Sequence, residues 1–332
     1  MKKILFFISS LLIGILLFFL VIRVVGWQEI KRSFLVFTGF QGVIIFTLTL
    51  LMLVVSTLRW NEILKNRDIN ISFKNLFMLY LANFAFLCFF PMMVFGGEFF
   101  RSYVLKRKYS VPLIKGLATI LVDRTLDLII NMIVVFSGVF LFLFKINHFS
   151  KILAVGWVSL FVFLAFLISI FYVRIFRKGG MLVPIARFLE KRNSGAQVLQ
   201  LKEEVLNTFK FKKESLLKTL GWSVLRCGVA VFRIWILVFF LGKTMAIGSA
   251  FSVLSFTCLT ALIPVPFIIG THEAIQAFVF EKLGLGAGMG TAFTMIIRGT
   301  EILVALIGIF ILLHLGTALL REIISDKLRK FF

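Results

Sequence analysis

The stretch "FFPMMVFGGEFFRSYVLKRK" (89–108) interrupts a long apolar run and ends in a run of cations. Pro91 cannot donate the backbone hydrogen bond that a helix requires, and Gly96 and Gly97 are weak helix formers. Glu98 follows directly, although the chain has only 15 acidic residues. A carboxylate beside a helix break inside apolar sequence indicates a polar position at membrane depth, where broken helices line protein or water-filled cavities.

Composition places the whole chain in a membrane. Of its 332 residues, 60% are hydrophobic and 16% are charged, which is too little charge for the outer surface of a soluble helical protein. Apolar runs of about 20 residues recur along the chain, as in proteins that cross a bilayer several times. The net charge of +22 does not indicate nucleic-acid binding, because the basic residues lie in short loops and form no aromatic-basic face.

The apolar runs fall into two kinds. The predicted crossing segments are 4–24, 42–60, 113–144, 152–176, 216–241 and 288–319. Two lysines precede the first of these segments and no cleavage site follows it, so it is predicted to be an uncleaved span. Two further regions, 75–112 and 247–285, are interrupted by "PMMVFGGE" (91–98) and "PVPFIIGTHE" (264–273).

Loop charges suggest how these two interrupted regions lie in the membrane. A full crossing by 75–112 would place five cations outside, against the tendency of basic residues to stay in the cytoplasm. They are Arg101, Lys106, Arg107, Lys108 and Lys115. We therefore expect a re-entrant hairpin that enters from the cytoplasm and returns there. The region 247–285 has only Lys243 and Lys282 near its ends, which favours a hairpin from the outer side.

This choice gives a consistent topology with both termini in the cytoplasm. The loop 59–74, which begins with Arg59, the densely basic segment 177–215 and the basic tail 321–332 are all predicted to be cytoplasmic. The external loop 24–41 fits least well, because it holds two cations. Within 177–215, a helical stretch with apolar residues along one side fits either an interfacial helix on anionic lipid or a solvated linker.

The two halves of the chain, 1–148 and 149–320, resemble each other. Each contains a proline, then glycine and glutamate, and about 25 residues later an Arg-x-x-acid motif, a match that indicates an internal repeat. The matched residues are Pro91 with Pro264 and Pro266, Gly96 and Gly97 with Gly270, Glu98 with Glu273, Arg124 with Arg298, and Asp127 with Glu301. Because the halves begin on opposite sides of the membrane, the sequence predicts an inverted-topology repeat, an architecture common in secondary transporters.

Ten charged residues are predicted to lie within the membrane segments. Charges at that depth are costly, so they mark either internal ion pairs or a polar pathway. Because well-packed apolar residues are often as stable as buried ion pairs, a polar cavity that binds an anionic substrate is the better account. For Glu98 a simple helix cap is the alternative. The candidate substrate-binding residues are Glu98, Arg101, Asp123, Arg124, Asp127, Arg226, Arg233, Glu273, Arg298 and Glu301.

Four motifs resemble one known family. "GGEFFR" (96–101), "DRTLD" (123–127), "PVPFIIGTHE" (264–273) and "RGTE" (298–301) are similar to the lysylphosphatidylglycerol synthase transmembrane region, also described as a flippase-like domain. The resemblance implies a protein that moves a lipid such as aminoacylated phosphatidylglycerol between leaflets. The aminoacyl-transferase of bifunctional members is a large soluble domain, and with only 13 residues after the last predicted span we expect no such domain here.

Catalytic motifs are otherwise absent from the sequence. The chain has three scattered histidines and no GxxxxGK[ST] phosphate loop, so we expect neither a metal site, a cofactor nor ATP hydrolysis. The sequence therefore predicts an all-α polytopic protein of the cell membrane, with about six transmembrane helices and two oppositely oriented re-entrant hairpins. Its expected partner is an anionic phospholipid or a lipid-linked envelope precursor. The alternative is a scaffold or regulator of a lipid or envelope-polysaccharide synthase, bound to a lipid-modifying enzyme or a glycosyltransferase.

Overall fold

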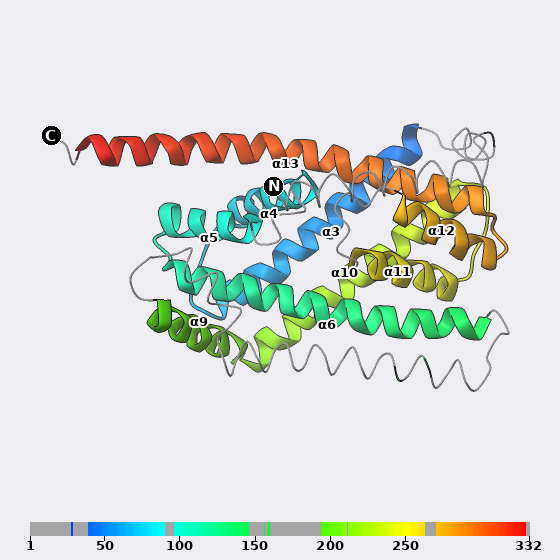
Figure 1. Cartoon of the computed structure of the whole chain (residues 1–332), viewed down its shortest axis with the longest axis horizontal. Helices are drawn as coiled ribbons and strands as arrows, with labels where there is room; N and C mark the ends of the chain where they lie inside the picture. Colours follow the sequence, from blue (N-terminus) through cyan, green and yellow to red (C-terminus); the bar gives the residue numbers. More distant parts are fainter. Residues whose placement is uncertain are drawn as a thin grey trace, which may run out of the picture.

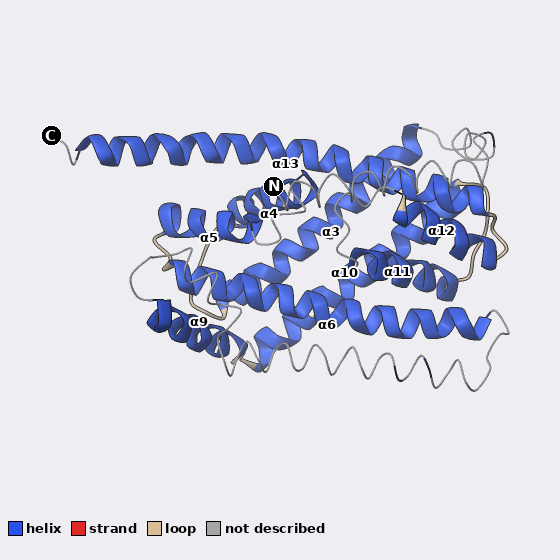
Figure 2. Cartoon of the chain, viewed as in Figure 1, coloured by secondary structure: helices blue, strands red, loops and turns tan. Residues whose placement is uncertain are grey.

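The computed structural model describes residues 39–89, 96–145, 194–210, 212–262 and 270–329, together with the single residues 28, 156 and 159. Over these ranges the chain forms helices and no strand (Figure 2). The helices are α3 (Gly39–Lys65), α4 (Phe73–Phe89), α5 (Gly96–Tyr109), α6 (Leu113–Lys145), α9 (Ser194–Phe209), α10 (Lys213–Phe240), α11 (Ile247–Leu262), α12 (Thr271–Lys282) and α13 (Ala287–Arg329).

Four of these helices are long and apolar enough to cross a membrane. They are α3, α6, α10 and the part of α13 that spans Ala287–His314. The shortest, α3, has 27 residues and is about 40 Å long, whereas a bilayer core is about 30 Å thick. The four match the predicted spans 42–60, 113–144, 216–241 and 288–319, while the predicted spans 4–24 and 152–176 lie outside the described residues. The chain is therefore a helical protein with several membrane-crossing segments.

Each interrupted region forms two shorter helices. The region 75–112 contains α4 and α5, and the region 247–285 contains α11 and α12. Gly96 and Gly97 begin α5, and Gly270 caps α12 with φ 91°, a conformation that favours glycine. The prolines at 91, 264 and 266 lie outside the described residues. Figure 1 shows the pairs α4–α5 and α11–α12 in opposite halves of the molecule.

Two close helix contacts involve glycines. On α13, a Cβ at Gly308 would lie 2.3 Å from the Leu81 carbonyl oxygen and 2.8 Å from Ala85 Cβ of α4. On α6, a Cβ at Gly138 would lie 1.6 Å from Ser255 Oγ of α11. The Phe251 carbonyl oxygen lies 2.9 Å from the same Cβ position. The two contacts therefore match: Gly138 corresponds to Gly308, Phe251 to Leu81 and Ser255 to Ala85, each pair 170 residues apart. Absence of a side chain lets each long helix approach the first helix of the pair in the other half of the sequence.

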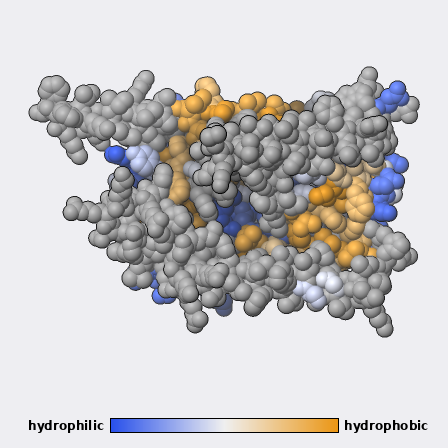
Figure 3. Space-filling model, viewed as in Figure 1, coloured by the Kyte–Doolittle hydropathy of each residue, from blue (hydrophilic) through white to orange (hydrophobic). Residues whose placement is uncertain are grey.

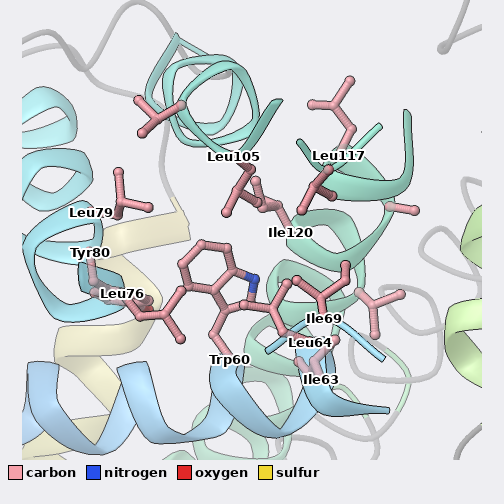
Figure 4. Close-up of a cluster of buried hydrophobic side chains, with 14 of the residues drawn as sticks. Trp60, Ile63, Leu64, Ile69, Leu76, Leu79, Tyr80, Leu105, Leu117 and Ile120 are labelled. Carbon is pink, nitrogen blue, oxygen red and sulfur yellow. The ribbon is translucent and has the colours of Figure 1, made fainter. Parts of the chain in front are cut away.

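The buried apolar residues form two clusters, one around each helix pair. In the first, Trp60 of α3 is fully buried among side chains of α4, α5 and α6 (Figure 4). The second joins α10, α11, α12 and α13, with Phe280 against Phe293 at its centre. Large apolar side chains also point outward from the long helices, including Phe239 on α10 and Phe310 on α13. Such an outer surface suits contact with lipid tails.

The helix α9, predicted as either an interfacial helix or a solvated linker, is partly buried against the protein. Leu201 and Val205 are buried against the protein, and α9 packs on α6. Glu204 also forms an ion pair with Arg67, which follows α3. Part of the apolar side of this helix therefore lies against α6, while Leu206 on the same helix is 43% exposed.

Candidate functional site: a central cluster of buried charges

Arg59 of α3 lies at the centre of the charged residues. Its Nε donates to Asp123 Oδ1 at 2.9 Å and its Nη1 donates to Asp127 Oδ1 at 2.6 Å. The two carboxylates are four residues apart on α6, so they share one face of that helix. The Arg59 side chain is only 1% exposed. The arginine therefore joins α3 to α6 through two buried, charge-assisted hydrogen bonds.

This position corrects the sequence prediction, which counted Arg59 with the cytoplasmic loop 59–74. The helix α3 continues to Lys65, so Arg59 lies within it and its charge is buried. The mistake arose because Arg59 falls at the end of the apolar run, where a cation ordinarily begins a loop. The sequence of the second half does indicate a buried position for Arg59. Arg233, one of the charges predicted within the membrane, lies 174 residues after Arg59, and the same separation joins Asp127 and Glu301.

Asp127 also connects the two halves of the chain. Its Oδ1 accepts a hydrogen bond from Arg226 Nη1 of α10 as well as from Arg59. Three helices, α3, α6 and α10, therefore meet at one carboxylate. The Arg226 side chain is 28% exposed although it lies near the middle of α10, so this end of the cluster is open to its surroundings.

Glu98 forms an ion pair with Arg124. Glu98 Oε1 accepts from Arg124 Nε at 2.9 Å and lies 2.8 Å from Nη2, which links the start of α5 to α6. With its amide oriented to suit both neighbours, Asn83 of α4 accepts from Arg124 Nη2 at 3.1 Å and donates to the Gly97 carbonyl at 3.2 Å. A Cβ at Gly97 would lie 2.3 Å from the terminal amide of Asn83, which explains why glycine precedes Glu98.

The corresponding pairs in the second half are longer. Arg298 Nη1 lies 3.4 Å from Glu301 Oε2 on α13, and Arg233 Nη2 of α10 lies 4.0 Å from Glu301 Oε1. Arg233 Nη1 also donates to Thr49 Oγ1 at 3.1 Å. The pair Arg233–Glu301 thus occupies the place that Arg59–Asp127 occupies in the first half, but it is held less tightly.

Glu273 has a different role from its sequence counterpart Glu98. Its Oε2 accepts from the backbone N–H of Gly270 at 2.7 Å, so it caps its own helix α12. The helix-cap interpretation considered for Glu98 therefore fits Glu273, whereas Glu98 binds an arginine of another helix.

Arg101 contacts aromatic side chains, and no carboxylate oxygen of the described residues lies within 4.0 Å of it. It is completely buried on α5, with the carbon of its guanidinium 3.7 Å from the ring centre of Trp60 and 4.9 Å from that of Tyr80. None of its three guanidinium nitrogens has a hydrogen-bond partner among the described residues. The sequence indicated the charge of Arg101 but not these aromatic neighbours, which come from two other helices.

A smaller polar network between α11 and α12 was not predicted. Gln276 Nε2 donates to Thr257 Oγ1 at 2.9 Å, and Thr260 Oγ1 lies 3.1 Å from His272 Nδ1. These residues hold the second helix pair together. Within the described ranges, no group of three metal-ligating side chains is present.

Comparison with known proteins identifies the family. The family model of the lysylphosphatidylglycerol synthase TM region matches residues 7–308. The chain belongs to this family. A UPF0104 membrane protein from Methanocaldococcus jannaschii is 27% identical over 315 residues, which cover 87% of this chain and 88% of the relative. A second UPF0104 membrane protein, from Pyrococcus horikoshii, is 24% identical over 304 residues, with 84% and 89% covered. No solved structure matches.

In this member of the lysylphosphatidylglycerol synthase TM family, the predicted site residues divide into three groups. Arg59, which the sequence prediction omitted, gathers Asp123, Asp127 and Arg226, and the pair Glu98–Arg124 lies beside them on α5 and α6. The second group, Arg233, Arg298 and Glu301, lies on α10 and α13. The third consists of Arg101 and Glu273, which form no ion pair within 4.0 Å among the described residues.

Proposed function

We propose that this family member moves an anionic or aminoacylated phospholipid, or a lipid-linked envelope precursor, between the leaflets of the cell membrane. The observation that carries the proposal is the charge cluster where α3, α6 and α10 meet. A cluster of this size inside crossing helices is costly, and ion pairs that served only for stability could be replaced by apolar residues. Its retention therefore supports a role in binding a charged molecule.

Partial exposure of three arginines supports a polar opening. The side chains of Arg124, Arg226 and Arg298 are 35%, 28% and 30% exposed, and each lies near the middle of its crossing helix. A guanidinium at that depth does not face lipid tails, so its exposed part borders water or headgroups. Figure 3 shows a hydrophilic area near the centre of this face, between apolar areas on both sides.

The proposed mechanism exchanges partners within the cluster. A phosphate group offers an arginine the same bidentate geometry as a carboxylate. When a headgroup reaches Arg124 or Arg226, it competes with Glu98 or Asp127 for the guanidinium. The displaced carboxylate then favours return to the ion-paired state, which releases the lipid.

The architecture proposed for this movement is an inverted repeat with two re-entrant hairpins. It is supported by the opposite placement of α4–α5 and α11–α12, by the matched glycine contacts of α6 and α13, and by the matched pairs Arg59–Asp127 and Arg233–Glu301. Repeats of this kind allow a central site to open alternately to either side.

Reconstitution tests the proposed function. The purified protein is placed in vesicles that contain fluorescent phosphatidylglycerol, and a membrane-impermeant reductant reports how much label is in the outer leaflet. We expect the protein to speed the exchange of phosphatidylglycerol well beyond that in protein-free vesicles, with a smaller effect on net-neutral phosphatidylcholine. Exchange no faster than in protein-free vesicles would favour the scaffold alternative.

A labelling experiment tests the opposed hairpins. Lys108 and Lys282 are exposed lysines near the ends of α5 and α12, the second helices of the two pairs. In a background without Cys88, Cys227 and Cys258, Lys108→Cys should react with an impermeant maleimide only from the cytoplasmic side, because the basic end of α5 stays inside. Lys282→Cys should react only from outside. Labelling of both from one side would contradict the opposed arrangement.

A further inference from the structure

The central charges do not balance once Arg59 is included. The ten charged residues predicted to lie within the membrane segments, with Arg59 added, are six arginines and five carboxylates, which leaves one positive charge in excess. The arginines are Arg59, Arg101, Arg124, Arg226, Arg233 and Arg298, and the carboxylates are Glu98, Asp123, Asp127, Glu273 and Glu301.

Distances to the carboxylates indicate which arginine carries the excess positive charge. Five of the six lie within 4.0 Å of a carboxylate oxygen, and Arg101 is the one that does not. Its Nε, Nη1 and Nη2 are buried without a hydrogen-bond partner among the described residues. A guanidinium presents five N–H donors, and buried donors that remain unpaired destabilise a fold. The charge count and the hydrogen-bond count therefore select the same residue.

The surroundings of Arg101 hold its guanidinium in place. Trp60 and Tyr80, from α3 and α4, belong to one buried cluster (Figure 4), and both rings lie within cation–π distance of the guanidinium. The aromatic faces attract the positive charge but accept none of its conventional hydrogen bonds. Arg101 also lies in the first half of α5, whose N-terminal end adds positive potential through the helix dipole.

We propose that Arg101 binds one singly charged oxoanion, either the phosphodiester of a lipid headgroup or a free phosphate ion. The fork of the guanidinium suits two oxygens of such a group, and a single negative charge cancels the excess in the cluster. A diphosphate would leave negative charge uncompensated. The inference rests on the proposed function, because it names the residue and the anionic group for the same site.

Fluorescence of Trp60 gives a direct measure of this binding. The other tryptophans, Trp27, Trp157, Trp222 and Trp235, are replaced by phenylalanine in the full chain. The purified protein in neutral detergent is titrated with dihexanoyl phosphatidylglycerol and, separately, with inorganic phosphate. Dihexanoylglycerol, which has no phosphate, is the control ligand. We expect a saturable change in Trp60 emission with the phospholipid, because anion binding alters the guanidinium 3.7 Å from the ring.

Three variants make the assignment specific. Arg101→Gln should weaken the affinity at least tenfold, and Arg101→Lys should give an intermediate affinity because it keeps the charge but not the fork. Arg107→Gln is the matched control, since Arg107 lies on the same helix and is exposed. It should bind as the parent protein does. If phosphate gives the same saturable change in Trp60 emission and competes with the phospholipid, the site binds a free anion. If only the phospholipid changes the emission, the site binds the lipid headgroup.

Two results would overturn the proposal: no change in Trp60 emission with either anion, or equal affinity in the Arg101→Gln protein. If the Arg101→Gln variant does not fold, binding is instead tested by thermal unfolding of the parent protein and of the Arg107→Gln variant, each with and without the anion. A bound anion must raise their melting temperature, and the absence of any rise would overturn the proposal. Binding is measured in detergent, where no leaflets exist, so its failure would be distinct from a failure of lipid translocation.

Discussion

Replacement of Arg59 by methionine should destabilise the protein by about 3–5 kcal/mol, because it leaves buried carboxylates without their partner. Asp123 would lose the arginine that binds its Oδ1, and Asp127 would keep only Arg226. Methionine preserves most of the side-chain volume, so the loss measures charge more than packing. Thermal unfolding of the purified protein in detergent, together with its elution as a single species, is the measurement.

Two further variants define the cause of that loss. Arg67→Met breaks an ion pair with Glu204 that is less buried, and it should cost about 1 kcal/mol or less. Adding Asp123→Asn to Arg59→Met removes one of the orphaned charges and should recover part of the stability. If Arg59→Met unfolded at the temperature of the parent protein, Arg59 would not be the centre of the cluster.

A second large effect is expected from Gly308→Leu on α13. The new Cβ would lie 2.3 Å from the Leu81 carbonyl oxygen, and backbone of α4 cannot move aside as a flexible side chain can. Overpacking of this kind costs about 1–3 kcal/mol, and more where helices must separate. Gly299→Leu is the matched control on the same helix, because a Cβ there meets nothing within 4 Å.

Both substitutions make the same change in helix propensity, which by itself favours leucine over glycine. We therefore expect the melting temperature of the Gly308→Leu protein to fall well below that of the parent, while that of Gly299→Leu stays level or rises slightly. Equal melting temperatures for the two variants would show that α4 does not pack closely against α13.

The long helices could be predicted because each is a continuous apolar run with polar residues at its ends. Proline and glycine at 91–97 and 264–270 likewise marked the two interruptions, and α5 and α12 begin where those stretches end. These features are local in sequence, so composition and helix propensity are sufficient to detect them.

The pairing within the site could not be predicted in the same way. Arg59 meets Asp123 and Asp127 across 64 and 68 residues, and Arg226 meets Asp127 across 99. A cation at the end of an apolar run has the same local sequence whether it begins a loop or turns into the protein. Only the packing of α3 on α6 distinguishes the two.

The surroundings of Arg101 and the buried side of α9 depend on tertiary contacts as well. Trp60 and Tyr80 reach Arg101 from two other helices, and Leu201 is covered by the early turns of α6. The sequence pattern along α9 showed an apolar side, which is equally suited to lipid and to protein. The pattern therefore identifies the side that is buried but not the surface that buries it.

If the charge cluster moves an anionic lipid, Glu98 and Glu273 should respond differently to the loss of their charge. In Glu273→Gln, the amide oxygen can still accept the hydrogen bond from the Gly270 N–H. The substitution should therefore lower the free energy of unfolding by about 1 kcal/mol or less. Glu98→Gln keeps the size of the side chain but removes the charge that binds Arg124 and is exchanged in the proposed mechanism.

The decisive measurement is phosphatidylglycerol translocation in vesicles that contain equal amounts of the parent protein, Glu98→Gln or Glu273→Gln. Both variants should insert and elute as the parent does. We expect Glu98→Gln to lose translocation and Glu273→Gln to keep most of it. Translocation by Glu98→Gln at the rate of the parent protein would show that the charge of Glu98 is not needed for lipid movement, and that the pair Glu98–Arg124 serves only to hold α5 against α6.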